Sequence, residues 1–467
     1  MKSPVIAKIV EHDLCIGCGV CAAICPQGVL KMEWNRYGEY NPVEVMQCTK
    51  ECGLCLNACP FADYDKNEDT IGKELYGKVS GISHRPGIGY YLTSFVGYSE
   101  MHRMASASGG MATWLLESLL NEGVIDHVIC VAPTGDPEKL FVFRVFDTPE
   151  GLRTGAGSAY YPVEMSGVIR HILEHPGRYA VTGLPCFIKA IRLAQQSSAK
   201  LRERIIVCAG LVCGQLKSRY FTDYIAALAE VQKRVTAVRY RGKSPDHPSN
   251  NYHYAFTTAD GERRKIFWNN GIAEAWGSRW FTPNACNYCD DIFAECADVT
   301  FMDAWLPEYS SDYKGTNLVL VRSPLVQEII QNGINSRQLS LKLIPIQEIV
   351  RSQDGVIQDK NIHISYRLYR ARKQGLQAPI KRVPPMCLAF HPVLRKEIEL
   401  KEEMRVTSRN FWINQYSREF SDRNTFRKML VPYLTRLNQY YQISRFVVLP
   451  INAFYAIPRR LRSYLNG

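Results

Sequence analysis

Two runs of cysteines near the start of the chain are the strongest constraint on this fold. The first run, residues 15–26, has the spacing C-x2-C-x2-C-x3-C-P. The second, residues 48–60, reads C-x3-C-x2-C-x3-C-P, with one extra residue after its first cysteine. Thiolates this close in sequence ligate metal, because a single tight loop presents several of them to one site. The runs therefore predict a small metal-binding module over residues 1–65.

The spacing is that of bacterial ferredoxins with two [4Fe–4S] clusters. In that arrangement three cysteines of a run hold one cluster and the fourth reaches the other. This rule assigns Cys15, Cys18, Cys21 and Cys59 to a first cluster, and Cys48, Cys52, Cys55 and Cys25 to a second. Two zinc sites are the alternative, but zinc usually takes paired C-x2-C knuckles rather than runs of four that end in Cys-Pro.

The remaining chain is long enough for a substantial folded body. Its 467 residues, 46% hydrophobic and 22% charged, suit two or three domains with their own cores. No run of about 18 apolar residues and no apolar signal segment at the start is present. We therefore expect a cytoplasmic protein whose sixteen cysteines serve metal ligation rather than disulfides.

Strands and helices alternate along the body. A helix is predicted over 111–123, strands over 124–133 and 139–148, and strand–loop–helix units over 178–196 and 204–230. This order predicts an α/β fold with partly parallel strands. Residues 236–269 predict an inserted set of antiparallel strands with a hairpin at Asp260-Gly261. The expected organisation is a module at 1–65, a linker at 66–104, two halves of the body at 105–235 and 236–390, and a helical basic tail at 391–467.

Loops that follow the strands or open the helices carry the candidate site residues. Ser108-Gly109-Gly110 and Gly157-Ser158 form Gly/Ser loops before helices. Such a loop offers free N–H groups to a phosphate, although a Ser cap with glycines also simply starts a helix. Cys186 and Cys213 follow strands, at the edge where α/β sheets carry their sites.

Together these segments resemble the coenzyme F420 hydrogenase/dehydrogenase beta-subunit family over about residues 85–370. The motifs that carry the resemblance are Ser108-Gly109-Gly110, Gly157-Ser158-Ala159-Tyr160, Thr182-Gly183-Leu184-Pro185-Cys186, Cys213-Gly214, Tyr240-Arg241-Gly242-Lys243, and Cys286-x2-Cys289 leading to Ala297-Asp298-Val299-Thr300 and Asp303-Ala304-Trp305. Members of this family are iron–sulfur flavoproteins. The resemblance implies FAD in the α/β domain and a third [4Fe–4S] cluster near it.

The resemblance also implies residues for each cofactor. Cys186, Cys213, Cys286 and Cys289 would hold the third cluster, with Cys296 as an alternative to one of them. The residues that would contact FAD are Ser108, Gly109, Gly110, Gly157, Ser158, Tyr160, Thr182, Gly183 and Lys243. Lys243 would contact a phosphate or the ring of FAD, unless it is a surface lysine. Cys130, Cys208 and Cys387 are expected to be structural. The chain departs from the family at Phe187, Gly214-Gln215 and Met302, which bears on a deazaflavin substrate more than on the flavin.

The C-terminal tail is strongly basic. Residues 404–467 hold 11 Lys/Arg and 2 Asp/Glu, most of the formal net charge of +12. Such a tail suits an anionic membrane surface, an acidic protein or nucleic acid, and a solvated helical tail is the alternative. The apolar run 446–458 is too short to span a bilayer, so it could lie in a membrane interface, cover a partner or pack on the body. No nucleic-acid motif accompanies the charge, so nucleic-acid binding is not expected.

The sequence therefore predicts an FAD- and iron–sulfur-dependent oxidoreductase. A ferredoxin-like donor or a partner redox subunit would exchange electrons with the N-terminal clusters. Flavin would transfer hydride to or from an organic or deazaflavin-type acceptor, because it handles one or two electrons. The alternatives are an electron-transfer subunit without its own substrate and a regulatory protein that has lost its flavin. No side chain stands out as a catalytic acid or base, and the direction of electron flow is open.

Overall fold

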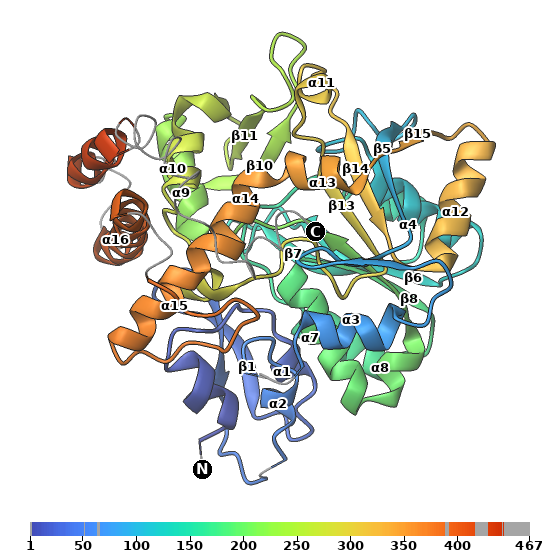
Figure 1. Cartoon of the computed structure of the whole chain (residues 1–467), viewed down its shortest axis with the longest axis horizontal. Coiled ribbons are helices and arrows are strands. Elements are labelled where there is room, and N and C mark those ends of the chain that lie inside the picture. The colour runs from blue at the N-terminus through green and yellow to red at the C-terminus, as the bar shows by residue number, and fades with distance from the viewer. Residues whose placement is uncertain are drawn as a thin grey trace.

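The structure is a computed structural model that describes residues 2–50, 52–62, 66–387, 392–415, 428–440 and 442. A small N-terminal module lies at one end of the molecule, against a large mixed sheet with helices on both faces (Figure 1). The predicted α/β class with a separate N-terminal module is confirmed.

The N-terminal module is built around two short helices that each follow a cysteine-rich loop. Helix α1 (Val20–Ala23) begins after Gly19 and α2 (Leu54–Asn57) after Gly53. Both glycines have left-handed backbones, with φ of 81° and 65°, which a side chain would strain. A hairpin of β1 (Leu30–Trp34) and β2 (Tyr40–Glu44) closes the module. Each cysteine run therefore curves tightly into its helix.

The body is organised by an eight-stranded sheet in the order β15-β5-β14-β13-β9-β8-β6-β7. Its strands are β5 (Thr93–Ser99), β6 (His127–Pro133), β7 (Phe141–Phe146), β8 (Tyr179–Gly183), β9 (Ile205–Leu211), β13 (Val299–Asp303), β14 (Asn317–Val321) and β15 (Leu339–Leu343). Strands β6, β8, β9 and β13 run parallel to one another. Their carboxyl ends therefore meet at one edge of the sheet.

Side chains alternate between the two faces of the sheet, and each face has its own helices. On β6, Val128 packs with α4 (Met111–Asn121) and α12 (Pro324–Asn335). Its neighbour Ile129 packs on the other face, with α6 (Ser166–Glu174) and α7 (Pro185–Ser197). The N-terminal module belongs to that second core, so α7 lies between the module and the sheet.

A second, three-stranded sheet forms the predicted antiparallel insertion. It consists of β10 (Val235–Gly242), β11 (His253–Thr258) and β12 (Arg263–Phe267). The predicted hairpin is confirmed, with Gly261 at φ 86° between β11 and β12. Helix α9 (Arg219–Leu228) shares an aromatic-rich core with these strands. The remaining helices are α3 (Glu68–Tyr76), α5 (Pro149–Arg153), α8 (Ala199–Arg204), α10 (Ala273–Gly277), α11 (Pro307–Ser310), α13 (Ile346–Ser352), α14 (Asp354–Ile357), α15 (Ile364–Lys373) and α16 (Pro392–Gln415).

Residues 66–104 differ from the expected linker. They contain α3, the hairpin of β3 (Ser83–Arg85) and β4 (Gly89–Tyr91), and β5, which pairs with β14 and β15 inside the main sheet. The polar, Gly-rich sequence hides β5 because its hydrogen-bond partners, such as Val321 opposite Thr93, come from much later in the chain. This segment therefore belongs to the body.

The first part of the basic tail packs on the body. Leu400, Met404 and Phe411 of α16 are buried in the aromatic core, and Leu430 and Leu437 from the helix over 428–440 join them. The 446–458 run, for which membrane contact is predicted, lies outside the described residues. Among the helices of the described part of the chain, none has the length and apolar character to cross a membrane.

Arg409 fastens α16 to the N-terminal module. Its guanidinium donates to both carboxylate oxygens of Asp13 at 2.7 and 2.9 Å, and to Glu39 at 3.0 and 2.9 Å. Glu39 is buried, so losing Arg409 would leave an uncompensated charge. We expect Arg409→Met to lower the free energy of unfolding by about 3 kcal/mol, measured in urea. Arg436→Met, at an exposed position, is the control, and an equal effect of the two substitutions would contradict the account.

Candidate functional site

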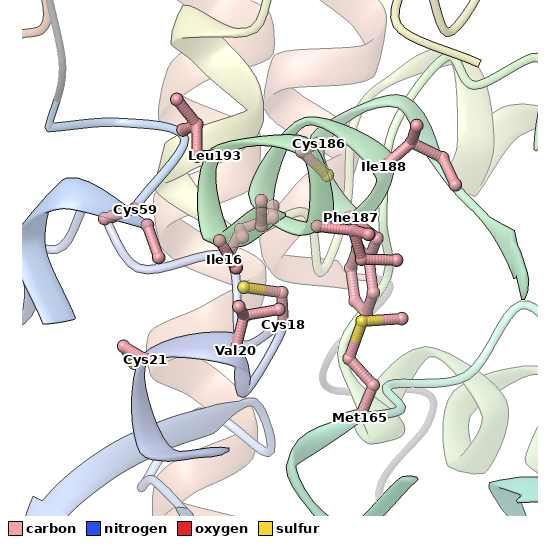
Figure 2. Packing of buried hydrophobic residues seen from close by; sticks show 14 of the residues in the cluster. Ile16, Cys18, Val20, Cys21, Cys59, Met165, Cys186, Phe187, Ile188 and Leu193 are labelled. Carbon is pink, nitrogen blue, oxygen red and sulfur yellow. The ribbon is translucent and has the colours of Figure 1, made fainter. Parts of the chain in front are cut away.

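The cysteines of the first predicted set, the inner set, lie together on the side of the module that faces α7. Burial raises the pKa of the Cys15 thiol, and the nearby thiolates of Cys59 and Cys18 raise it further. The pKa of Cys21 is raised by burial and then by Cys18, Cys15 and Cys59. Figure 2 shows Cys18, Cys21 and Cys59 beside α7. Cys59 of the second run thus joins three cysteines of the first, as the ferredoxin pattern predicts.

The second set, the outer set, lies where the module is exposed to solvent. Cys25, Cys48, Cys52 and Cys55 line one pocket. Cys52 is exposed, whereas Cys48 and Cys55 are buried. All four cysteines reach the pocket despite the extra residue after Cys48. Through Cys52, this set is open to solvent.

The third set forms at the carboxyl edge of the parallel strands. Cys186 lies in the first turn of α7, shortly after β8, and Cys213 follows β9. Cys286 and Cys289 come from a short helical turn and the residue after it. Burial raises the pKa of Cys186, and then Cys289, Cys213 and Cys286 do so in that order. Three separate segments therefore bring four thiols to one place.

The sulfurs of the third set receive hydrogen bonds from the protein. The Leu216 N–H donates to Cys286 Sγ at 3.3 Å, and Lys360 Nζ donates to Cys289 Sγ at 3.2 Å. Donors of this kind support the thiolates of iron–sulfur sites. A single zinc ion would instead need its sulfurs about 3.8 Å apart. Nowhere in the described residues do three His, Cys, Asp or Glu side chains have the spacing for one metal ion. Sets made of thiols alone fit iron–sulfur clusters, whose ligands are cysteine thiolates.

Cys296 lies apart from the third set. Burial raises the pKa of its thiol, followed by the carboxylates Glu68 and Asp291, and no other cysteine is among the causes. Its carbonyl accepts hydrogen bonds from Arg192 Nε at 3.0 Å and from the Tyr76 hydroxyl at 3.1 Å. The geometry therefore favours Cys213 and Cys186 over Cys296 as members of the set.

The cysteines expected to be structural lie elsewhere. Cys130 and Cys208 are buried in β6 and β9. Cys387 accepts a hydrogen bond from Arg395 at 3.3 Å. None of the three is among the causes that raise the pKa values of Cys15, Cys21 and Cys186.

One continuous core holds members of all three sets, including Cys48 and Cys55 of the second. It contains Cys18, Cys59, Cys186 and Cys289 together with Phe187 and residues of α7. Figure 2 shows Cys186 on α7 itself and Leu193, two turns along the helix, toward Cys59. Cys59 of the first set and Cys186 of the third set therefore both lie beside α7.

Buried ion pairs within the body lie next to this helix. Lys189 of α7 pairs with Glu68 of α3 at 3.1 Å, and Arg382 pairs with Glu295 at 2.8 Å. A small cleft between Phe61 of the module and the body is lined by several of these charges. The module meets this charged part of the body through Phe61, whose ring lies under Lys381 Nζ at 5.1 Å.

The predicted flavin residues Ser108, Gly109, Gly110 and Lys243 lie in one corner of the sheet edge. Lys243 Nζ donates to the carbonyl of Ser108 at 2.9 Å and to that of Arg103. Burial, Arg103 and Arg241 lower the pKa of Lys243 to about 7. Lys243 is therefore a half-buried member of a cationic corner and not a surface lysine. A Cβ on Gly109 would lie 2.7 Å from the Gly97 carbonyl, so packing alone explains that glycine.

Tyr160 extends this corner through Arg241. Arg241 donates to the Tyr160 hydroxyl at 3.3 Å and pairs with both oxygens of Asp303 at 2.9 Å. Tyr160 packs edge-on against Trp276 and stacks with Tyr254. Within the described residues, Arg241 Nε and the Tyr254 hydroxyl are buried without hydrogen-bond partners. Orphaned polar atoms beside aromatic rings and cations fit a polar, planar ligand with phosphates.

Of the other predicted flavin residues, Thr182 and Gly183 lie near the third cysteine set. Thr182 and Gly183 end β8, and a short turn then links them to Cys186. Thr182 Oγ1 donates to the Ile129 carbonyl at 3.4 Å. Gly157 and Ser158 lie on the loop that leads to Tyr160, and a Cβ on Gly157 would meet open space. The predicted residues thus surround the sheet edge without forming one contact group.

Sequence reasoning missed three residues of this edge. Arg103 lies five residues before the Gly/Ser loop, and Arg241 lies within the Tyr-Arg-Gly-Lys motif, where its charge was a usable signal. Lys360 is 71 residues from the cysteine that it contacts, and no local pattern marks it.

The chain matches family models over much of its length. The coenzyme F420 hydrogenase/dehydrogenase beta subunit is matched by its N-terminal model at residues 94–170 and by its C-terminal model at residues 177–346. A 4Fe-4S dicluster domain is matched at residues 14–62.

Relatives are known among methanogen proteins. One F(420)H(2) dehydrogenase subunit of Methanosarcina mazei is 23% identical over 329 residues, 69% of this chain and 83% of that protein. Coenzyme F420-dependent sulfite reductase of Methanocaldococcus jannaschii is 28% identical over 189 residues, 40% of this chain but 26% of that protein. A chain of the F420-reducing [NiFe] hydrogenase complex from Methanosarcina barkeri aligns with a TM-score of 0.48 and 20% identity, over 64% of this chain and 98% of that chain.

Proposed function

Because the chain belongs to the coenzyme F420 hydrogenase/dehydrogenase beta-subunit family and carries a 4Fe-4S dicluster domain, we propose that it transfers electrons through three [4Fe–4S] clusters and one FAD. The observation that carries the proposal is the convergence of Cys186, Cys213, Cys286 and Cys289 at the sheet edge, in the same core as the inner set of the module. When bound, clusters carry single electrons and FAD exchanges single electrons for hydride.

The residues of the chain give the path its order. The exposed Cys52 supports entry at the outer set, where a ferredoxin-like protein or a partner redox subunit would reach it. The inner set, with Cys59, lies against α7, and Cys186 lies at the start of that helix. Helix α7 is the element that both sets share, and the ion pair between Lys189 and Glu68 anchors this helix to α3. The same path serves either direction of electron flow.

The cationic corner is the proposed FAD site. Arg103 and Arg241 already pair with Asp312 and Asp303, so Lys243 would supply the charge that faces the diphosphate. Tyr160 would contact a ring. The unpartnered Arg241 Nε and Tyr254 hydroxyl supply donors for ligand oxygens. The proposed substrate is an organic or deazaflavin-type hydride acceptor that meets the flavin at this edge.

A subunit role is the second candidate. The chain aligns with 83% of a relative named as a dehydrogenase subunit, which favours work within a larger redox complex. In that case this chain would pass electrons to a partner and have no substrate of its own. Hydride transfer to a soluble acceptor by the purified chain separates the two candidates, because a pure electron-transfer subunit would show none.

Lys243→Met tests the FAD site directly. A charge-assisted hydrogen bond contributes about 1.5–3 kcal/mol, so we expect about tenfold weaker FAD binding, measured by titrating the flavin-free protein. Iron content should not change. Arg263→Met removes an exposed positive charge from β12, two strands away from β10, and is the control. Unchanged FAD affinity in Lys243→Met would place the flavin elsewhere.

A further inference from the structure

Lys360 is a buried lysine whose ammonium contacts a candidate cluster ligand. The residue is 2% exposed, and Nζ donates to Cys289 Sγ at 3.2 Å and to the Asp291 carbonyl at 2.8 Å. An ammonium is costly to bury unless negative charge or acceptors surround it. The Asp291 carboxyl is also nearby, and burial raises its pKa to about 8, so it is largely neutral. A neutral thiol, a neutral carboxyl and a carbonyl are weak compensation for a full positive charge, whereas a cluster held by four thiolates is anionic.

The carboxylate next to Lys360 in sequence is engaged elsewhere. Asp359 forms ion pairs with Arg279 and Arg367 and lies 3.5 Å from His363 Nδ1. Lys360 therefore points toward the cysteines while its neighbour points toward the arginines. The π-helical segment Gln358–His363 between α14 and α15 produces this arrangement, and π-turns often occur where a side chain has a functional role.

We infer that Lys360 is a positioning residue that holds the Cys289 thiolate and raises the reduction potential of the third cluster. This inference rests on the proposed third cluster. Reduction adds one negative charge to a cluster, so a nearby ammonium and its hydrogen bond stabilise the reduced form more than the oxidised form.

The inner set differs in its charged neighbours. Lys189 lies near Cys59, but it pairs with Glu68 at 3.1 Å, and that carboxylate offsets its charge. The Gly17 N–H donates to Cys15 Sγ at 3.4 Å, and this donor carries no net charge. The third cluster should therefore have a higher potential than the inner cluster, so that electrons entering through the module would settle next to the flavin.

Redox titration of the anaerobic full-length protein, followed by electron paramagnetic resonance, tests this inference. Lys360→Met should keep about twelve irons per chain and lower the midpoint of the third cluster, with about a tenfold higher oxidised-to-reduced ratio at a fixed potential, or about 59 mV for one electron. Lys360→Gln keeps an N–H donor without the charge, so it should lower the midpoint of the third cluster by less. Lys360→Arg should keep a midpoint near that of the wild type. Lys373→Met, at an exposed position on α15, is the control, because it should leave this midpoint unchanged.

The outcomes separate the inference from the proposed function. An unchanged midpoint in Lys360→Met, with iron retained, overturns the inference and leaves the three clusters standing. About eight irons in the wild-type protein overturns the proposed third cluster itself. If Lys360→Met loses iron, Lys360→Gln and Lys360→Arg decide: a Gln midpoint below the Arg midpoint supports the inference, and equal midpoints overturn it.

Discussion

Replacing Cys286 with serine is expected to remove about four of roughly twelve irons per chain, because three thiolates and a hydroxyl hold a [4Fe–4S] cluster poorly. Cys286 is buried and accepts the Leu216 N–H, so the protein already orients its sulfur toward the third set. Iron and sulfide analysis of the anaerobic variant gives the count, and electron paramagnetic resonance shows which signal is lost. Reduction of the flavin by electrons that enter through the module should stop when this cluster is lost.

Cys296→Ser is the matched control for this experiment. Cys296 is fully buried and belongs to the same core as Cys286, but its thiol faces carboxylates rather than other cysteines. We expect the Cys296→Ser variant to keep all of its iron. Iron loss in Cys296→Ser together with retention in Cys286→Ser would mean that the assignment of the third set is wrong. Retention in both variants would mean that no third cluster exists.

The second large effect is expected from Cys59→Ser at the inner set. Cys59 crosses from the second cysteine run to the first set, and it lies against α7 on the side of the body. Its loss should remove about four irons and interrupt the path between the outer cluster and the sheet edge. Stopped-flow mixing with a reduced ferredoxin should then show no flavin reduction, although a small chemical reductant should still reduce the flavin directly.

Cys130→Ser controls for the loss of a buried cysteine. Cys130 lies in β6, away from the three sets, and its replacement should leave both the iron content and the rate of flavin reduction unchanged. If Cys59→Ser transferred electrons from ferredoxin at the wild-type rate, the inner set would lie off the path. The order of the three sets would then have to be revised.

Sequence reasoning went furthest where the chemistry is local. The cysteine runs and the glycines beside them encode the module within a short stretch of chain, since ligands of a cluster must curve around it. The parallel strands and the Asp260-Gly261 hairpin also carry their signals in short windows. Cys186 and Cys213 are visible as cysteines after strands, but their meeting with Cys286 follows only from the family resemblance.

Long-range pairing explains what the sequence did not reveal. Strand β5 has no pattern of its own because β14 and β15 supply its partners from the far end of the body's sequence. Lys360 and Arg409 are ordinary charged residues in sequence, and burial against distant groups gives each its role. The sequence around Gly109 suggests a phosphate-binding loop, yet the close approach of the Gly97 carbonyl is enough to require glycine at position 109.

The most direct test of three clusters and a flavin in one chain is the quantity of iron, sulfide and flavin per chain after anaerobic purification. The account predicts about twelve irons, a matching amount of sulfide and one FAD. About eight irons and no flavin would contradict it and leave a two-cluster electron carrier attached to a body without a redox role.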